Sequence, residues 1–508
     1  MKEKNILEAL SDIRDEYIEE ARTTKLKKHT NSWRRMAAIA ACAILVIAIS
    51  GIFIIENFYP FGGSSGGFGH DEGTGFMSYA GPVFPLTLSE PDNTITASRI
   101  LQYDFSLPHA DSIRVWGADV TDSYILANSS AEEKRIKAIY PFAGSFSELY
   151  KQMPVIYVDG HALLPTLYAG GYAIALDDND KAAHLKLKMF KSSRWEDYKN
   201  LLKDGQYQKN ALAPYPDLSQ KVTVYTFSDF KAPEGYTAAT QAICFTIDPD
   251  KTSILKYGFN GGEFGENGFR RYSYFVPNAR EKGILSKKML IVIGDDITEY
   301  SLQGYKTGDC SKGNELEGVS CTVERSERIL SELISEIVDD YFTHSDYNDD
   351  PAIPRQMVAG VLSDFMQTVV LTGSEKLKYP SEMIEDYISE VLHRQRVFYL
   401  VFEAAIPAGE SIHIKAEMYK EPSYDYTCSD KGSKGIQGYE MVTRLGSNLH
   451  FDSITAEIAS FEFIKIVRQN FGFDKASGIS KVTLDPNVEH YYLEIRALEI
   501  SQSGGQGN

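Results

Sequence analysis

The cysteines are the residues of this chain whose positions most directly suggest chemistry. Cys42 lies in an apolar run, and the others, Cys244, Cys310, Cys321 and Cys428, allow three disulfide pairings. Cys310 and Cys321 flank a loop that contains Gly, Ser and Asn, so we predict that a disulfide closes this hairpin. Free thiols, as in an anaerobic organism, are the alternative. No spacing among the cysteines suggests a zinc site.

Acidic clusters offer the oxygen ligands that Ca²⁺ binds in proteins. The clustered residues are Asp177, Asp178 and Asp180, and Asp346, Asp349 and Asp350. Neither cluster has the full spacing of an EF-hand loop, so both are better interpreted as solvated turns. We therefore predict no metal site.

Other motifs point away from catalysis. Gly62, Ser64 and Gly66 match a G-x-S-x-G pattern, but a nucleophile elbow needs a strand before it and a helix after it. The glycine-rich segment 259–269 lacks the Lys and Ser/Thr of a phosphate cradle, which favours a mobile loop. His413 alternates with apolar residues, so it faces solvent. We predict no catalytic residue, no cofactor and no enzyme activity; a hydrolase would need a nucleophile–base pair that the sequence does not reveal.

A membrane span is the clearest element of the sequence. Residues 36–55, MAAIAACAILVIAISGIFII, carry no charge and would span roughly 30 Å as a helix. The polar stretch before them is too long for an ordinary signal peptide. Basic residues without acidic ones precede the span, namely Arg22, Lys25, Lys27, Lys28, Arg34 and Arg35. The positive-inside rule then predicts a single-pass protein of the cell membrane, with a cytosolic N-terminus and an extracytoplasmic C-terminal part.

The cytosolic segment has the pattern of an amphipathic helix. Its apolar residues recur every three or four positions and include Ile6, Leu7, Leu10, Ile13, Tyr17 and Ile18. A helix this short is marginal alone, so its apolar stripe should pack on a partner. Its acidic polar face disfavours anionic lipid, which leaves a cytosolic protein partner. A frayed tail that only sets topology is the alternative.

Beyond the span, the chain reads mainly as strands. Short runs rich in β-branched and aromatic residues lie at 120–126, 134–140, 155–160, 221–227, 242–248 and 289–294. Three apolar stripes at helical spacing interrupt them: Ile329 to Tyr341, Met357 to Met366, and Ile384 to Leu392. We predict a mainly-β, β-sandwich-like ectodomain with an inserted three-helix block, α+β in total.

The predicted organisation follows the chain in order. Its parts are the cytosolic helix and basic flank (1–35), the transmembrane helix (36–55), a glycine-rich linker (56–80), a first β-sandwich-like domain (81–235), a second β-rich domain (236–500) with the helical insertion (323–393), and a disordered tail (501–508). The net charge of −18 disfavours a nucleic-acid binder, because phosphate neutralisation needs a basic surface.

Parts of the sequence resemble known proteins. The segment KNILEALSDIRDEYIEEA, the basic stretch with Trp33 and the alanine-rich span resemble the N-termini of single-pass membrane proteins of unknown function from Gram-positive, Clostridia-type bacteria, some of them anti-sigma-factor-like. The stretch VTDSYILANSSAEEKRIKAIYPFAG and the following VIYVDG resemble extracytoplasmic β-domains of unknown function. Segments of the C-terminal third, such as NFGFDKASGISKVTLD, resemble the same family. The zinc ligands of zinc-type anti-sigma factors are missing, since His29 stands alone.

The resemblance and the topology together leave two classes of function. The first is a transmembrane regulator or sensor whose ectodomain detects an unknown ligand and whose N-terminal helix contacts a cytosolic partner such as a sigma factor. The second is a membrane-tethered binding or structural module of the envelope with no signalling role.

Overall fold

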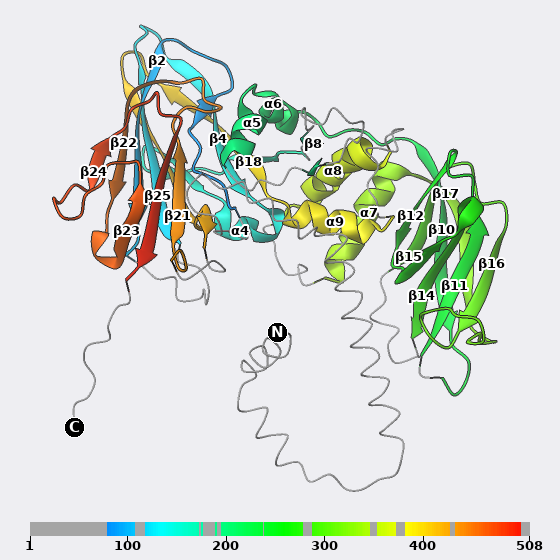
Figure 1. Ribbon diagram of the computed structural model, residues 1–508. Helices are drawn as coiled ribbons and strands as arrows, with labels where there is room; N and C mark the ends of the chain where they lie inside the picture. Colours follow the sequence, from blue (N-terminus) through cyan, green and yellow to red (C-terminus); the bar gives the residue numbers. More distant parts are fainter. Residues whose placement is uncertain are drawn as a thin grey trace, which may run out of the picture. The chain divides into compact units, whose positions relative to one another are not determined.

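The computed structural model describes most of the chain beyond the predicted linker. The described residues are 79–106, 117–171, 174–175, 188–189, 195–236, 238–277, 287–345, 353–371, 382–426 and 432–498. As predicted, this part is mainly β, with several antiparallel sheets and a few helices (Figure 1). The predicted strands at 120–126 and 289–294 both lie inside observed strands.

The large sheet contains seven strands. In spatial order they are β24 (Lys481–Thr483), β22 (His450–Ile458), β2 (Ile95–Asp104), β3 (Ala118–Asn128), β19 (Ser411–Lys420), β5 (Val155–Val158) and β6 (His161–Ala162). β2 and β22 run parallel, and the other neighbours run antiparallel. Buried and exposed residues alternate along β2, β3 and most of β19, so one face of the large sheet packs on a core and the other faces out.

Two smaller sheets contribute to the same core. One orders as β1 (Thr87–Leu88), β4 (Lys134–Gly144), β18 (Arg396–Ile406) and β7 (Thr166–Ala169), the other as β20 (Tyr424–Asp425), β21 (Gln437–Val442), β25 (His490–Ala497) and β23 (Ile464–Gln469). Tyr124 of the large sheet, Leu400 of β18 and Leu493 of β25 belong to one buried cluster. Strands before residue 170 therefore share sheets with strands after residue 395, and in Figure 1 blue and cyan strands lie beside yellow and orange ones.

Short helices cover the outer side of the β4/β18 sheet. They include α5 (Trp195–Leu202) and α6 (Gln206–Leu212), while α4 (Leu149–Gln152) follows β4 after a 3-10 turn (Phe146–Glu148). Trp195, Tyr198 and Leu202 of α5 form a cluster with Val397 and Tyr399 of β18. A further hairpin joins β8 (Ile174–Ala175) to β9 (Lys188–Met189), and a second 3-10 turn (Phe461–Phe463) precedes β23.

Residues 221–329 form two more sheets. One orders as β12 (Thr252–Tyr257), β15 (Lys288–Gly294), β10 (Lys221–Lys231) and β17 (Ser320–Ile329), the other as β13 (Gly261–Phe264), β14 (Phe269–Pro277), β11 (Ala238–Thr246) and β16 (Tyr300–Tyr305). Phe227 of the first sheet packs with Phe245 and Tyr274 of the second in a separate core. The predicted loop at 259–269 is partly wrong, because β13 pairs with β14 before a 3-10 turn (Glu266–Gly268).

The predicted helical stripes form helices with buried apolar faces. They are α7 (Leu330–Thr343), α8 (Arg355–Phe365), which continues into a π-helical turn (Met366–Val370), and α9 (Ile384–His393). Leu333, Leu362 and Ile388, one from each helix, lie in the large core. The segment 323–329, predicted as the start of the helical insertion, instead belongs to β17. It pairs with β10, and the helix starts only at Leu330.

No helix among the described residues is both long enough and apolar enough to cross a bilayer. The predicted span at 36–55 and the amphipathic segment before it lie outside the described residues.

Candidate functional site

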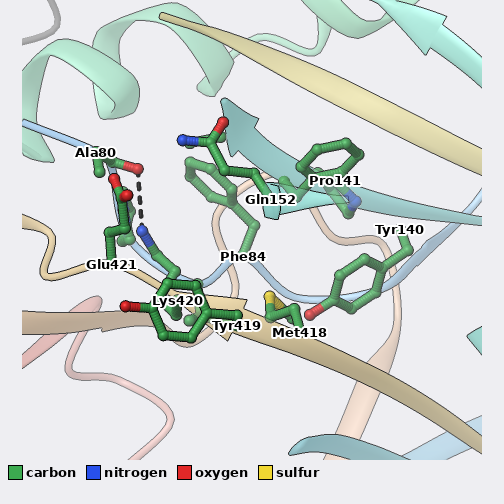
Figure 2. A pocket seen from close by; sticks show the side chains of 13 residues that line it. Ala80, Phe84, Tyr140, Pro141, Gln152, Met418, Tyr419, Lys420 and Glu421 are labelled. Atoms are coloured by element: carbon green, nitrogen blue, oxygen red, sulfur yellow. Dashed lines mark hydrogen bonds between the residues drawn. The ribbon is translucent and has the colours of Figure 1, made fainter. Parts of the chain in front are cut away.

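A small cavity lies where the N-terminal end of the described chain meets β4, α4 and the end of β19. Figure 2 shows its lining, which consists of Ala80, Pro82, Val83, Phe84, Tyr140, Pro141, Phe142, Ala143, Gln152, Met418, Tyr419, Lys420 and Glu421. Lys420 is its only cationic residue. The Nζ of Lys420 donates a hydrogen bond of 3.0 Å to the Ala80 carbonyl, drawn as a dashed line in Figure 2.

Lys420 and Glu421 titrate away from their usual ranges. Burial lowers the pKa of the Lys420 ammonium to about 8, although the carboxylates of Glu421 and Glu440 oppose this. Burial, with help from Glu148, raises the pKa of Glu421. A lysine that loses its proton near neutral pH, beside a carboxyl group, has the properties of a general base or nucleophile.

The size of the cavity limits this chemistry. Only about 20 Å³ of it is wide enough for the centre of a water molecule. That volume accommodates about one water and no organic substrate. Gln152 is also occupied, because its Oε1 accepts from the Ser145 N–H at 3.1 Å and its Nε2 donates to Glu148 at 3.1 Å. The geometry therefore suits a hydrated buried amine rather than a reaction centre.

A second polar group surrounds Glu440 of β21. The Tyr79 hydroxyl donates to Oε2 of Glu440, and Nε2 of His490 lies 2.9 Å from Oε1. A histidine held by a carboxylate is the arrangement that general bases use. The imidazole, however, stacks on the Trp195 ring with centroids 4.9 Å apart, and its side chain is 11% exposed. The group connects the first described residues and α5 to the β21/β25 sheet, which favours a structural role.

The outward face of the large sheet presents side chains to solvent. Its strand register places the outward residues in rows: Glu457, Gln102, Thr121 and Glu417 form one row, and Ser453, Ser98, Ile125 and His413 another. At the β22/β2 end these residues are hydroxyl, amide or charged groups. We call this half the polar end.

Apolar residues gather at the other end of the same face. Met153, Val155 and Tyr157 alternate with buried Pro154 and Ile156, so they point outward. β5 pairs with β6, and the Leu163 N–H donates to the Ile156 carbonyl, which brings Leu164 opposite Val155. We call Met153, Val155, Tyr157 and Leu164 the apolar edge.

Exposure separates the apolar edge from ordinary surface. Met153 is 41% exposed, Val155 is 46% exposed and Leu164 is fully exposed. Tyr150 of α4, just before the edge, is 57% exposed. β6 is the last strand of the large sheet, so the apolar edge also has a sheet edge beside it. Contiguous exposed apolar groups of this kind mark surfaces that bind partners.

Most of the predicted site residues lie outside the described residues. Ile6, Leu7, Leu10, Ile13, Tyr17 and Ile18 lie outside the described residues, as do Cys42, Cys428 and the two acidic clusters. Among the described residues there is no group of His, Cys, Asp or Glu that would hold a metal ion. His413 is exposed, as predicted.

The structure does not join Cys310 to Cys321, because both are free thiols. Cys321 accepts a hydrogen bond from Tyr274, which faces the core between the two sheets of 221–329. Cys310 packs on Ala242 and Tyr305 in a different cluster. The β11/β14 sheet therefore lies between the two sulfurs.

Sequence reasoning missed the apolar edge and Lys420. Lys420 carried a signal, since it continues the inward phase of Ile412, Ile414 and Ala416 along β19. The apolar edge carried none, because every residue from Val155 to Val158 is apolar or aromatic and the outward phase cannot be told from the inward one.

No protein-family model matches this chain, and no curated protein matches it. The resemblance drawn from the sequence motifs therefore stays a prediction.

Proposed function

We propose that this chain is a membrane-anchored extracytoplasmic protein that binds a protein partner through the apolar edge and works as a transmembrane regulator. The single observation that carries the proposal is the cluster of outward apolar residues on β5 and beside β6, at one end of a face whose other end is polar. Apolar side chains that a sheet exposes in register lose water-exposed area only when a partner covers them.

The chemistry of the apolar edge favours a protein over a small ligand. The edge lies on the outward face of a sheet and at its last strands, whereas drug-sized ligands need concave sites. Polar and charged residues border it, including His413, Lys415 and Glu417 of β19. An apolar centre with a polar rim is the usual composition of a protein–protein interface. The aromatic ring of Tyr157, covered by the Lys415 ammonium at 4.5 Å, adds a polarisable contact.

The regulator part of the proposal rests on the sequence of residues 1–55. Its supports are the uncharged run at 36–55, the basic flank before it and the amphipathic pattern of 5–21. The large sheet and two smaller sheets share one buried core, which gives a rigid support on which an outer face can recognise a partner.

The test of partner binding uses the full chain in its membrane. A photo-crosslinking amino acid replaces Leu164. A second variant carries both this replacement and Val155→Asp. The matched control is Thr455→Asp, which places the same charge on a half-buried outward position at the polar end. We expect one defined adduct, at least tenfold weaker with Val155→Asp and unchanged with Thr455→Asp.

The outcomes separate the alternatives. An adduct equally weakened by both substitutions would show that the strands, rather than the apolar edge, had been disturbed, and would contradict the proposal. Absence of any adduct would also contradict it. An adduct between two copies of this chain would identify the partner as a second copy.

The signalling role needs its own test, because the second candidate is a tethered envelope module without signalling. Deleting residues 2–21 should change the transcriptional profile if the N-terminal helix binds a cytosolic partner such as a sigma factor. Ile13→Asp should give the same change, since it places a charge on the apolar stripe. An unchanged profile in both variants would favour the envelope module.

A further inference from the structure

The loop between β16 and β17 carries a cysteine over the outer face of the β11/β14 sheet. Residues 306–319 connect these strands, and Cys310 is buried against Ala242 and Tyr305. Ala242 lies on the outer face of β11, opposite Ser273 of β14. Cys310 therefore covers this face from the loop side.

A second cysteine lies on the same face. Cys244 follows Ala242 by two positions on β11, so their side chains point the same way and are separated by about 7 Å along the strand. Cys244 is opposite Arg271 of β14. Both sulfurs interact electrostatically with the Arg271 guanidinium and the Glu263 carboxylate. The two thiols therefore lie near the same pair of charged groups.

We propose that Cys244 and Cys310 form a disulfide under oxidising conditions, and that this bond fixes the 306–319 loop to the β11/β14 sheet. Bonded cysteines need Cα atoms about 4.4–6.8 Å apart. Cys310 packs on Ala242, the neighbour of Cys244 on the same face of β11, so the bond requires the loop to shift along the strand toward Cys244. Cys321 is excluded from both sulfurs by the sheet, since it bonds to Tyr274 on the other side. The cysteines that are closest in sequence are thus not the ones that the fold brings together.

Exposure assigns an order to the two thiols. Cys244 is half-buried and Cys310 is buried, so an oxidant reaches Cys244 first. The Cys244 thiolate attacks a disulfide oxidant, forms a mixed disulfide and releases one oxidant thiol. The Cys310 thiolate then attacks the Cys244 sulfur and releases the second oxidant thiol. The protein loses two protons and two electrons, and the oxidant gains both. Burial raises the pKa of both thiols, and the Arg271 guanidinium opposes that rise, so oxidation should be slow at neutral pH and faster at alkaline pH.

The test maps the bonds in the full chain with Cys42 and Cys428 replaced by Ser. The purified protein is treated with excess oxidised glutathione, remaining thiols are alkylated, and linked peptides are identified by mass spectrometry. We expect one crosslinked peptide pair that joins residue 244 to residue 310, with Cys321 alkylated. In Cys310→Ser we expect a trapped glutathione adduct on Cys244. In Cys244→Ser we expect Cys310 to stay unbonded and, because it is buried, to be alkylated only after the protein is unfolded.

A second readout follows the loop itself. Lys306 and Lys312 are exposed in it, so trypsin cuts there in the reduced protein. We expect oxidation to slow cleavage of the full chain at these lysines by at least fivefold, and Cys244→Ser to abolish that protection while Cys321→Ser retains it. A 310–321 or 244–321 link would overturn the proposal. The proposal would also be overturned if Cys244 and Cys310 both remained free for alkylation under conditions that oxidise the exposed thiols of a control protein.

Discussion

Two arginines of the described residues lie in the interior, and their surroundings differ. Arg99 on β2 forms a two-pronged ion pair with Asp122 on β3, with Nε–Oδ1 at 2.8 Å and Nη2–Oδ2 at 2.9 Å. Its remaining donors reach the carbonyls of Val442 and Phe84 at 2.7 and 3.2 Å. Arg396 at the start of β18 donates only to carbonyls, those of Gly170 and Val391, at 3.0 and 2.6 Å. Among the described residues, its Nε has no hydrogen-bond partner.

The two environments shift the pKa of the guanidinium in opposite directions. At Arg99 burial acts to lower the pKa, but Asp122 and the nearby tyrosines outweigh it, so the pKa is raised. At Arg396 burial dominates and the pKa is lowered. A direct ion pair with a carboxylate thus stabilises the charged form of a buried guanidinium. Carbonyl dipoles alone do not offset the cost of burying the charge.

Geometry explains why Arg396 remains buried nonetheless. Val391 lies in the last turn of α9, whose carbonyls lack partners within the helix. The Arg396 guanidinium caps that turn and lies over the Phe146 ring at 4.8 Å. Arg99 connects the large sheet to the β21/β25 sheet, whereas Arg396 connects a helix end to a sheet.

The largest effect should come from breaking the Arg99 pair. Asp122→Asn keeps the shape but leaves a buried guanidinium without its counter-charge, and we expect a loss of about 3–5 kcal/mol in the free energy of unfolding. Urea unfolding of the purified chain in detergent measures it. Glu133→Gln removes the exposed partner of Arg135 and should change almost nothing. Equal effects in the two variants would remove the distinction between buried and exposed pairs.

Lys420, another buried cation, extends the comparison to pH. Its pKa is about 8 in the folded chain and 10.5 when unperturbed, so between these values the unfolded state binds more protons. Stability therefore rises with pH across this window, by at most about 3 kcal/mol. Lys420→Met should lack that rise.

The measurement is the difference between wild type and Lys420→Met in urea unfolding from pH 7 to 10.5. Taking the difference matters because burial raises the pKa values of Tyr124 and Tyr140, so at the alkaline end these tyrosines ionise in the unfolded state and lower the stability of both proteins. A pH-independent difference would mean that Lys420 is not desolvated in the folded chain.

Arg396 should matter less than Asp122. Arg396→Met removes a poorly paired charge but also two hydrogen bonds to carbonyls, and we expect a net loss of about 2 kcal/mol in the free energy of unfolding. Urea unfolding at pH 7 measures it. A loss as large as that of Asp122→Asn would indicate that helix capping and ring contact stabilise a buried arginine as well as a carboxylate does.

The buried pair was accessible to sequence reasoning, although it was not predicted. Arg99 occupies the inward phase of β2, between Ala97 and Leu101, and Asp122 occupies the inward phase of β3. A charged residue at an inward position of each of two neighbouring strands is a signal for a buried pair. The strands and the helical stripes were predicted because their periodicity is local.

The remaining features depend on contacts between distant segments. β4 pairs with β18, more than two hundred and fifty residues later, and no local pattern encodes that partnership. The position of Cys310 over β11 depends on such long-range register, whereas Val155 meets Leu164 through the geometry of a local turn. The predicted Cys310–Cys321 disulfide was wrong because the prediction relied on proximity in sequence, whereas the β11/β14 sheet separates the two sulfurs.

The smallest expected effect tests the hydrogen bonds around Asp122. The Tyr140 hydroxyl donates to Oδ2 of Asp122 at 3.0 Å, so Tyr140→Phe should lower the free energy of unfolding by about 1 kcal/mol. Tyr399 on β18 is equally buried, but among the described residues its hydroxyl has no hydrogen-bond partner. Tyr399→Phe should therefore be neutral or slightly stabilising in the same urea titration. Opposite signs in these two conservative changes would separate paired from unpaired buried polar groups, and matching losses would mean that a water molecule satisfies the Tyr399 hydroxyl.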